Sequence, residues 1–269
     1  MGGRVGDPVD DRGDGCVARP PYLVGVSEGA WDETVRRFLL EHRFGMDEVV
    51  TKLSILRDEF AHLHDYNPIE QVTARLKSPE SLLEKAERRG IDLDGPDPLA
   101  RVREEITDVA GVRVTCSFVS DVYHVVDLLM AQPDVTTLEL RDYIAEPKPN
   151  GYRSLHALVE VPVFLSGGSV PVVVEVQFRT IAMDFWASLE HKIYYKYRRD
   201  VPADLLAGLK EAADTAYALD ATMERLHQEV RGLDPLEDGV VESLRGAPGS
   251  MPASELIDSL RRLGSPPDA

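Results

Sequence analysis

KPNGYRSLHALVEVPV, residues 148–163, joins a polar turn to an apolar strand. The Asn150-Gly151 pair permits backbone with positive φ, so the chain can turn sharply there. After the turn, apolar residues alternate with more polar ones, which predicts a β-strand with one buried face. The turn presents Tyr152, Arg153 and His156 at the rim of a sheet, where they suit ring stacking and charge neutralisation. Taken alone, the segment is equally consistent with a hairpin turn that has a solvated basic flank.

A second strand is predicted after the Gly167-Gly168 turn, from Val170 to Thr180. Alternate residues from Val172 to Phe178 point one way, and Glu175 and Gln177 point the other way as neighbours on one face. An ionised Glu in an apolar strand is expensive to bury, which favours a metal or a cationic partner. The alternative is a Glu on the wet face of an antiparallel sheet.

A cationic helix is predicted between Ser78, its N-cap, and Gly90, which follows its last turn. Pro79 fits the first helical position. The basic or hydroxyl residues that share one face of this helix are Ser81, Lys85 and Arg88. Two further cations precede its N-terminus, where backbone N–H groups also favour an anion: Arg75 and Lys77. The pattern predicts a phosphate site; a solvated amphipathic helix balanced by its glutamates is the alternative.

Asp108 begins an alternating segment, residues 108–118, that is predicted to be a strand. An acidic residue where a helix hands over to a strand is a plausible Mg²⁺ ligand, although an ordinary turn Asp is commoner.

Six helices and a short strand are expected elsewhere. Apolar spacing predicts two helices separated by a break near Gly45, and their stripe packs on the body or on a partner. The third helix is expected at 98–107, and the fourth runs from an N-cap at Ser120 to residue 132. The fifth, at 181–197, is expected to have its aromatic residues mostly in the core. The sixth begins at Pro202 and carries a stripe that is either buried or faces a partner. A short strand is expected at 135–140.

Composition limits the class of protein. The chain has 269 residues, two cysteines and a formal net charge of -17. This charge argues against general attraction to duplex nucleic acid or anionic membrane, so any phosphate site must be a local basic patch. We expect a soluble, cytoplasmic protein without a membrane partner, with a disordered tail at 1–29, one domain at 30–232 and an acidic, flexible tail at 233–269.

Two other catalytic patterns are weak. His62, His64 and Asp65 resemble part of a metal-dependent phosphohydrolase site, but the remaining histidines lie in unrelated contexts, so surface histidines are expected. Ser154 and His156 lack an orienting acid for nucleophilic catalysis.

Four ordered segments resemble the synthetase domain of the RelA/SpoT family, over about Trp31 to Gly232. They are Arg75–Lys85, Asp108–Arg113, Lys148–His156 and Glu175–His191. The resemblance implies an α/β (α+β) fold: a mixed β-sheet flanked by helices, akin to nucleotidyltransferases, with helical N- and C-terminal extensions. The chain looks like a stand-alone small alarmone synthetase.

The resemblance also implies a reaction, in which the β,γ-diphosphate of ATP passes to the 3′-hydroxyl of GDP or GTP and AMP is released. It implies Mg²⁺ at Asp108 and Glu175, with Glu175 also orienting or deprotonating the hydroxyl. The implied ATP-binding residues, with Arg141 on a mobile loop, are Arg75, Lys77, Ser81, Lys85, Arg88, Arg113 and Arg141. The implied GDP- or GTP-binding residues are Lys148, Tyr152, His156, Gln177 and Asp184.

Several expectations stay open at this point. Asp184 could instead cap the following helix. The family suggests a homo-oligomer, as a homotetramer, and a possible single-stranded RNA partner, whereas the segment before the cationic helix lacks the aromatic that product-regulated members place there. A catalytically silent nucleotide- or RNA-binding regulator and an NMP-transferring enzyme are the competing functions.

Overall fold

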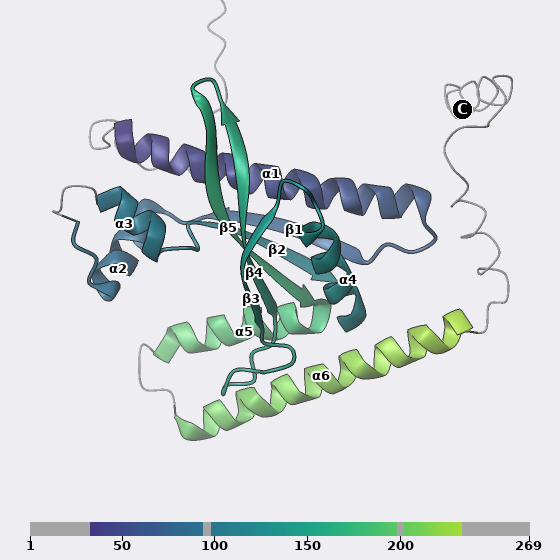
Figure 1. Cartoon of the computed structure of the whole chain (residues 1–269). Coiled ribbons are helices and arrows are strands. Elements are labelled where there is room, and N and C mark those ends of the chain that lie inside the picture. Colours follow the sequence, from purple (N-terminus) through teal and green to yellow (C-terminus); the bar gives the residue numbers. More distant parts are fainter. Residues whose placement is uncertain (1–32, 94–97, 198–201, 233–269) are drawn as a thin grey trace, which may run out of the picture.

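A five-stranded mixed sheet forms the centre of the computed structural model, which describes residues 33–93, 98–197 and 202–232 (Figure 1). The strands lie in the order β1-β2-β5-β4-β3. Their bounds are β1 Ile69–Leu76, β2 Ala110–Cys116, β3 Thr136–Asp142, β4 Leu155–Leu165 and β5 Gly168–Thr180. β2 pairs in parallel with β5, whereas β1 with β2, β5 with β4, and β4 with β3 are antiparallel. The expected mixed sheet is confirmed, and the predicted tails at 1–29 and 233–269 lie outside the described residues.

Helices α1 (Glu33–Leu63) and α4 (Val119–Met130) supply the apolar side chains that pack against the sheet. Val49 and Leu53 of α1 are fully buried, as are Val122 and Val125 of α4. They meet alternate residues of the strands because side chains on one face recur with a period of two. The principal core therefore lies on one face of the sheet, and the polar residues of the strands are left on the other.

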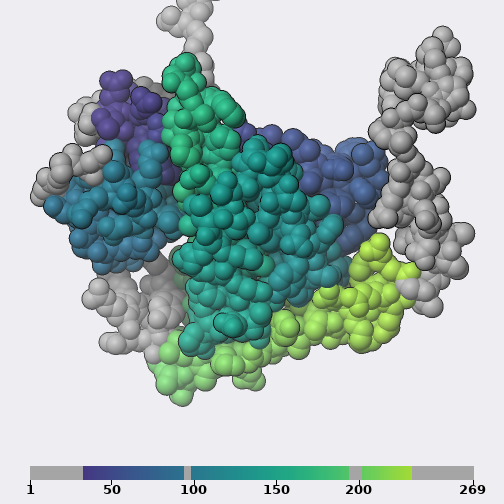
Figure 2. All heavy atoms as spheres, in the orientation of Figure 1, coloured from purple at the N-terminus to yellow at the C-terminus, as the bar shows by residue number. Residues whose placement is uncertain are grey.

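Smaller clusters hold the remaining helices. α2 (Pro79–Arg89) and α3 (Pro98–Glu105) pack around Phe38 near the beginning of α1. α5 (Ile181–Tyr197) and α6 (Ala203–Gly232) meet through Trp186, Leu209 and Ala213. Figure 2 shows the teal and green strands between the blue α2–α3 region and α6, which runs along the lower edge. No helix of the described residues is long and apolar enough to cross a membrane.

The predicted break near Gly45 is wrong, because α1 runs through it without interruption. A Cβ atom at Gly45 would lie 2.5 Å from Cγ1 of Val172 on β5. Glycine is therefore present because the helix approaches the sheet closely, and the burial of Met46 and Val49 on the same helix outweighs its low helix propensity.

The caps of α2 are as predicted. Ser78 Oγ accepts a hydrogen bond from the backbone N–H of Ser81, and Pro79 begins the helix. Gly90 has φ of 68° and closes it in the left-handed conformation. The orientation of the cationic face is thus fixed at both ends of the helix.

Two local expectations are corrected, and a third, the stripe of α6, stays a prediction. Ser120 lies inside α4, whose N-cap is Phe118, and the Asp121 carboxylate accepts the Phe118 N–H at 3.1 Å. In α5, Trp186 is buried but Phe185 is 65% exposed, because only one side of α5 faces α6. The apolar stripe of α6 is buried in this chain only at Leu209, and its later members are exposed: Leu219, Met223, Leu226 and Val230.

Candidate active site

Two neighbouring rows of mostly polar residues cross one face of the sheet. The strand register aligns the first row as Arg141, His156, Gln177 and Arg113. It aligns the second row as Glu139, Leu158, Glu175, Gly111 and Arg75. Because the two rows are two residues apart on each strand, their side chains point to the same face. The two rows thereby gather residues from all five strands on one face of the sheet.

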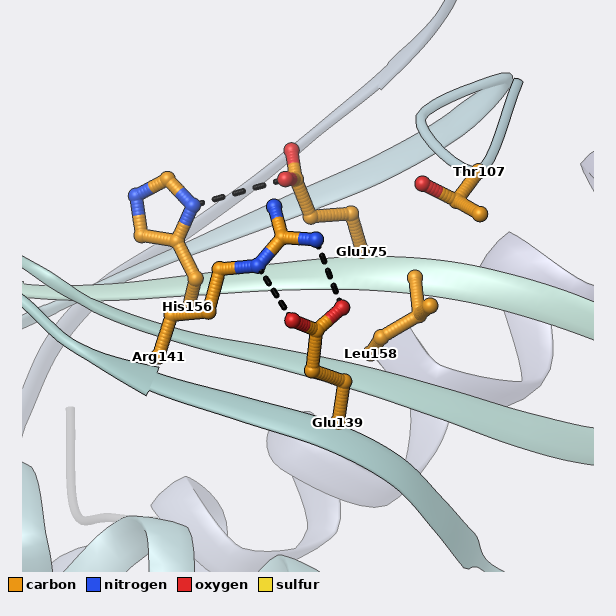
Figure 3. A pocket seen from close by; sticks show the side chains of 6 residues that line it. All are labelled: Thr107, Glu139, Arg141, His156, Leu158 and Glu175. Atoms are coloured by element: carbon orange, nitrogen blue, oxygen red, sulfur yellow. Dashed lines mark hydrogen bonds and ion pairs between the residues drawn. The ribbon is translucent and has the colours of Figure 1, made fainter. Parts of the chain in front are cut away.

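Glu175 lies in a pocket on this face, together with Thr107, Glu139, Arg141, His156 and Leu158 (Figure 3). Its Oε1 atom is 3.4 Å from Nδ1 of His156, and its Oε2 atom accepts a 2.9 Å hydrogen bond from Gln177. Burial raises the pKa of Glu175, but the contacts with His156 and Gln177 outweigh it and leave that pKa below its usual range. Glu175 is therefore an ionised carboxylate at neutral pH, available to a metal ion or a proton.

Arg141 is on strand β3, opposite His156, so the expected mobile loop is wrong for this residue. Its guanidinium donates two hydrogen bonds of 2.6 Å to the carboxylate of Glu139. The two residues are neighbours on one face of an edge strand, which is why they meet side by side in Figure 3. Arg141 projects into the Glu175 pocket from this position.

Asp108 is held by two cations of the predicted phosphate site. Lys77 Nζ lies 3.1 Å from its Oδ2 atom, and Lys85 Nζ lies 2.7 Å from its Oδ1 atom. Burial raises the pKa of Asp108, but the two lysines outweigh it and lower that pKa below its usual range. The Asp108 charge is also close enough to raise the pKa of Glu175 in part. Two ionised carboxylates and two ammonium groups therefore share this corner of the sheet.

Three further residues expected to bind ATP lie on α2 and β1. Ser81 is in the first turn of α2, where its hydroxyl lies 3.1 Å from that of Ser78. Arg88 is exposed on the last turn and donates to the Glu84 carbonyl. Arg75, at the end of the second row, is exposed. The structure brings Lys77 and Lys85 together at Asp108, and Ser81 precedes Lys85 by one turn on α2.

The turn at 148–156 has the predicted positive φ, 89° at Gly151. The Asn150 side chain accepts the Tyr152 N–H, and the Tyr152 hydroxyl lies 2.8 Å from Nε2 of His156. Lys148 Nζ sits 4.8 Å from the centre of the Tyr152 ring. The structure thus gathers the three residues that are expected to bind the acceptor nucleotide in this loop.

Arg153 departs from the expected rim of the sheet. Its guanidinium lies 4.0 Å from the ring centre of Tyr217 on α6 and donates a hydrogen bond to the Ile144 carbonyl. Arg153 therefore joins the loop to α6.

Asp184 links the two groups of expected nucleotide-binding residues. Its Oδ1 atom is 3.1 Å from Nη1 of Arg113 and accepts a 3.0 Å hydrogen bond from Nη1 of Arg179. The hydroxyl of Thr180 accepts the Met183 N–H at the beginning of α5, so Thr180 performs the capping role that was considered for Asp184. The Asp184 carboxylate is directed toward the sheet by its two arginines.

Three residues of this region were missed in the sequence. Glu139 stands two residues before Arg141 and shares its face, so the period of the strand could have revealed it. Arg179 stands two residues after Gln177 and could have been found in the same way. Tyr143, whose ring centre lies 4.4 Å from Lys148 Nζ, follows the end of β3 and has no sequence signal of its own.

The competing catalytic patterns find no support. Ser154 is fully buried and its hydroxyl donates to the Phe178 carbonyl, away from His156. His62 is exposed and bonds the Asp58 carbonyl in its own helix. Within residues 33–93, 98–197 and 202–232, no three His, Cys, Asp or Glu side chains form a metal cluster. Asp108 and Glu175 remain a pair of carboxylates, which is the protein contribution that many Mg²⁺ sites combine with phosphates and water.

The fold and the site define a class: a mixed sheet that carries paired carboxylates beside a cationic helix, an arrangement suited to nucleotide polyphosphates. Residues 74–200 match the model of the region found in RelA / SpoT proteins. The chain is 48% identical over 192 residues to GTP pyrophosphokinase YwaC of Bacillus subtilis, which covers 71% of this chain and 90% of that protein. It is 40% identical over 200 residues to GTP pyrophosphokinase YjbM of the same organism, covering 74% and 92%.

Solved structures agree with this match. Small alarmone synthetase 1 of Bacillus subtilis bound to its product pppGpp superposes with a TM-score of 0.68 and 39% identity, over 74% of this chain and all of that chain. Small alarmone synthetase 2 of the same organism gives a TM-score of 0.66 and 46% identity, over 73% of this chain. The chain belongs to the RelA/SpoT family, as its sequence motifs predicted.

Proposed function

We propose that this protein is a GTP/GDP pyrophosphokinase that makes ppGpp or pppGpp. The observation that carries the proposal is an ionised Glu175, held by His156 and Gln177, whose pKa is also influenced by the nearby Asp108 of the lysine cluster. The named activities of its relatives YwaC and YjbM, and the product pppGpp in the matched structure, support the same activity.

In this proposal the acceptor's 3′-oxygen attacks the β-phosphorus of ATP. The bond between that phosphorus and the oxygen bridging to the α-phosphate breaks, and AMP leaves with the bridging oxygen. Glu175 accepts or orients the proton of the attacking hydroxyl, for which an ionised carboxylate is required. The cations Lys77, Lys85 and Arg141 spread the phosphate charge, which is the main task in such transfers.

Asp108 and Glu175 fit a divalent metal ion, which we propose to be Mg²⁺. The Oδ1 atom of Asp108 is buried and lies 2.7 Å from Lys85 Nζ, but in the part of the chain that the structure describes this contact lacks the alignment of a hydrogen bond. Carboxylate oxygens of this kind suit a hard cation. When bound, Mg²⁺ would neutralise charge on the β- and γ-phosphates.

The remaining site residues have proposed binding roles. Arg75 and Arg113 would hold adenine between their planar guanidinium groups, because arginine stacks well on aromatic rings. Ser81 and Arg88 would contact the ATP phosphates. On the acceptor side, Tyr152 would stack on guanine, while Lys148 and His156 would face its phosphates and Gln177 and Asp184 would complete the pocket.

The partners beyond the nucleotides are also proposals. The exposed apolar stripe on α6 supports a homo-oligomer, with a homotetramer as the expected assembly. A cytoplasmic location agrees with nucleotide substrates. Single-stranded RNA stays a prediction from the family resemblance, and the net charge of -17 gives it no support.

The decisive experiment is a transfer assay with Mg²⁺, labelled ATP and GDP. We expect AMP and a slower-migrating guanine product, and we expect Glu175→Gln to reduce turnover by at least about a thousandfold, because it removes both a metal ligand and a base. Glu160→Gln, on the same sheet but outside the pocket, is the matched control. AMP formation that is independent of the guanine acceptor would contradict the proposal, and an α-phosphate in the guanine product would favour NMP transfer.

A further inference from the structure

Arg179 is a nearly buried cation beside the candidate active site. Arg179 is 5% exposed. It lies on β5, after Glu175 and Gln177 on the same face of the strand. A buried guanidinium is costly unless its donors are paired, so its partners indicate what the residue is for. All three side chains that accept its hydrogen bonds belong to the expected acceptor pocket: Tyr152, Gln177 and Asp184.

The bond to Tyr152 has a consequence for the next residue in the network. Arg179 Nη2 donates to the Tyr152 hydroxyl oxygen at 2.7 Å, because a guanidinium has no acceptor. The phenol proton is then free to be donated to Nε2 of His156, which lies 2.8 Å away. The same guanidinium carbon stands 5.2 Å from the centre of the Tyr152 ring.

The direction of this chain of hydrogen bonds fixes the form of His156. If Nε2 accepts the phenol proton, the proton of the neutral imidazole is on Nδ1. Nδ1 is the atom that faces Glu175 Oε1, at 3.4 Å. A donor therefore points at the carboxylate, whereas the opposite tautomer would direct a lone pair at it.

We propose that Arg179 is a positioning residue, which holds the Tyr152 ring and, through its hydroxyl, the Nδ1–H tautomer of His156 that faces Glu175. It touches neither nucleotide in this proposal and acts through Tyr152 and His156. The inference rests on the proposed function for the meaning of the pocket, but its hydrogen-bond geometry stands without any turnover.

Imidazole nitrogen NMR tests the proposal directly. The two-bond ¹⁵N–¹H spectrum of the wild-type protein at mildly alkaline pH, with the His156 signal assigned by its loss in His156→Gln, should show the Nδ1–H tautomer. Tyr152→Phe removes the phenol and should shift His156 toward a mixture of tautomers. An Nε2–H tautomer or an imidazolium in the wild type would overturn the proposal, even if the enzyme is fully active.

Kinetics supply the second test. Arg179→Lys keeps the charge but loses the fork of donors, so we expect about a tenfold rise in the KM for GDP with little change in the KM for ATP. Tyr152→Phe should raise the KM for GDP similarly. Because both changes cut the same link, the double variant should fall well short of the product of the two effects, about a hundredfold. A double variant whose KM for GDP rises by the full product of the two single effects would refute the link between Arg179 and Tyr152.

Arg153→Lys is the matched control. Arg153 lies next to Tyr152 on the loop at 148–156, but its guanidinium contacts Tyr217 on α6 and the Ile144 carbonyl. It should lower the melting temperature without a selective change in the KM for GDP. An Arg179→Lys protein that merely melts earlier, like the control, with the KM for GDP unaltered, would make Arg179 a structural residue only. Absence of transfer by the wild type would count against the proposed function, while the NMR result would still decide this inference.

Discussion

Charged residues in this protein have opposite effects on stability, depending on their partners. The lowered pKa of Glu175 and of Asp108 means that their ionised forms stabilise the fold, an effect present above the ordinary pKa values and lost as pH falls through the lowered ones. Asp220 on α6 behaves in the opposite way. Burial raises its pKa, the charge of Glu224 raises it further, and the hydrogen bond from Thr180 only partly offsets both.

Asp220→Asn should therefore stabilise the protein at pH 7. The amide oxygen can still accept the hydrogen bond from the Thr180 hydroxyl, which is 2.5 Å from the native carboxylate, while the cost of a buried charge is removed. The gain in unfolding free energy should shrink as pH falls toward the ordinary Asp pKa of about 3.9, where the native side chain is also protonated. Urea unfolding at several pH values measures it; a gain that grows on acidification would contradict this account.

At the residue scale, the sequence indicated candidate side chains for the site but not their mutual contacts. Alternation on β5 correctly placed Glu175 and Gln177 on one face, whereas the phosphate site predicted from the spacing on α2 stays a prediction. The sequence could not show that Lys77 and Lys85 would meet Asp108, because that contact joins three separate elements. Nor could it show that Arg153 turns to α6, since a single loop residue has no periodicity.

Elements were predictable wherever local chemistry alone determines them. The capped helix α2 and the alternating strands β4 and β5 follow from signals within a few residues. The continuity of α1 does not, because Gly45 has the same local signature whether a helix breaks there or passes close to a sheet. Only the position of Val172, far along the chain, separates the two cases.

Gly45→Ala tests this explanation of α1. Alanine favours a helix by about 1 kcal/mol over glycine, so an exposed site would be stabilised. Here we expect a loss of about 1 to 3 kcal/mol in unfolding free energy, because the new methyl group meets Val172. Adding Val172→Ala should recover part of the loss, and chemical denaturation of the single and double variants measures both. Stabilisation by Gly45→Ala alone would show that the contact does not limit the packing.

At the scale of the whole molecule, α6 carries an apolar stripe that is exposed to solvent in a single chain. Leu219, Met223, Leu226 and Val230 recur at helical spacing and are between 42% and 66% exposed. Exposed apolar stripes of this kind are typical of protein interfaces. The prediction of a partner-facing stripe is consistent with this exposure, but the partner itself is a proposal.

Met223→Glu should reduce the molar mass measured by light scattering after gel filtration, because it places a charge in the proposed interface. Gln228→Glu makes the same change in charge at an exposed position on another side of α6 and should leave the mass unaltered. A wild-type protein that elutes with the mass of one chain at micromolar concentration would exclude the homo-oligomer.

The parallel pairing of β2 with β5 also has a consequence for folding kinetics. Gly111 and Glu175 are paired partners, yet α4, β3 and β4 lie between them in the chain. Pairing of segments that are far apart in the chain is slow, because closing the long loop between them costs conformational entropy. We therefore expect this step to come late in folding. On the ribosome, Asp108 emerges well before its counterpart on β5. A chain that is released early therefore has the lysines and the first carboxylate but lacks Glu175 and most of the residues that are proposed to bind the acceptor.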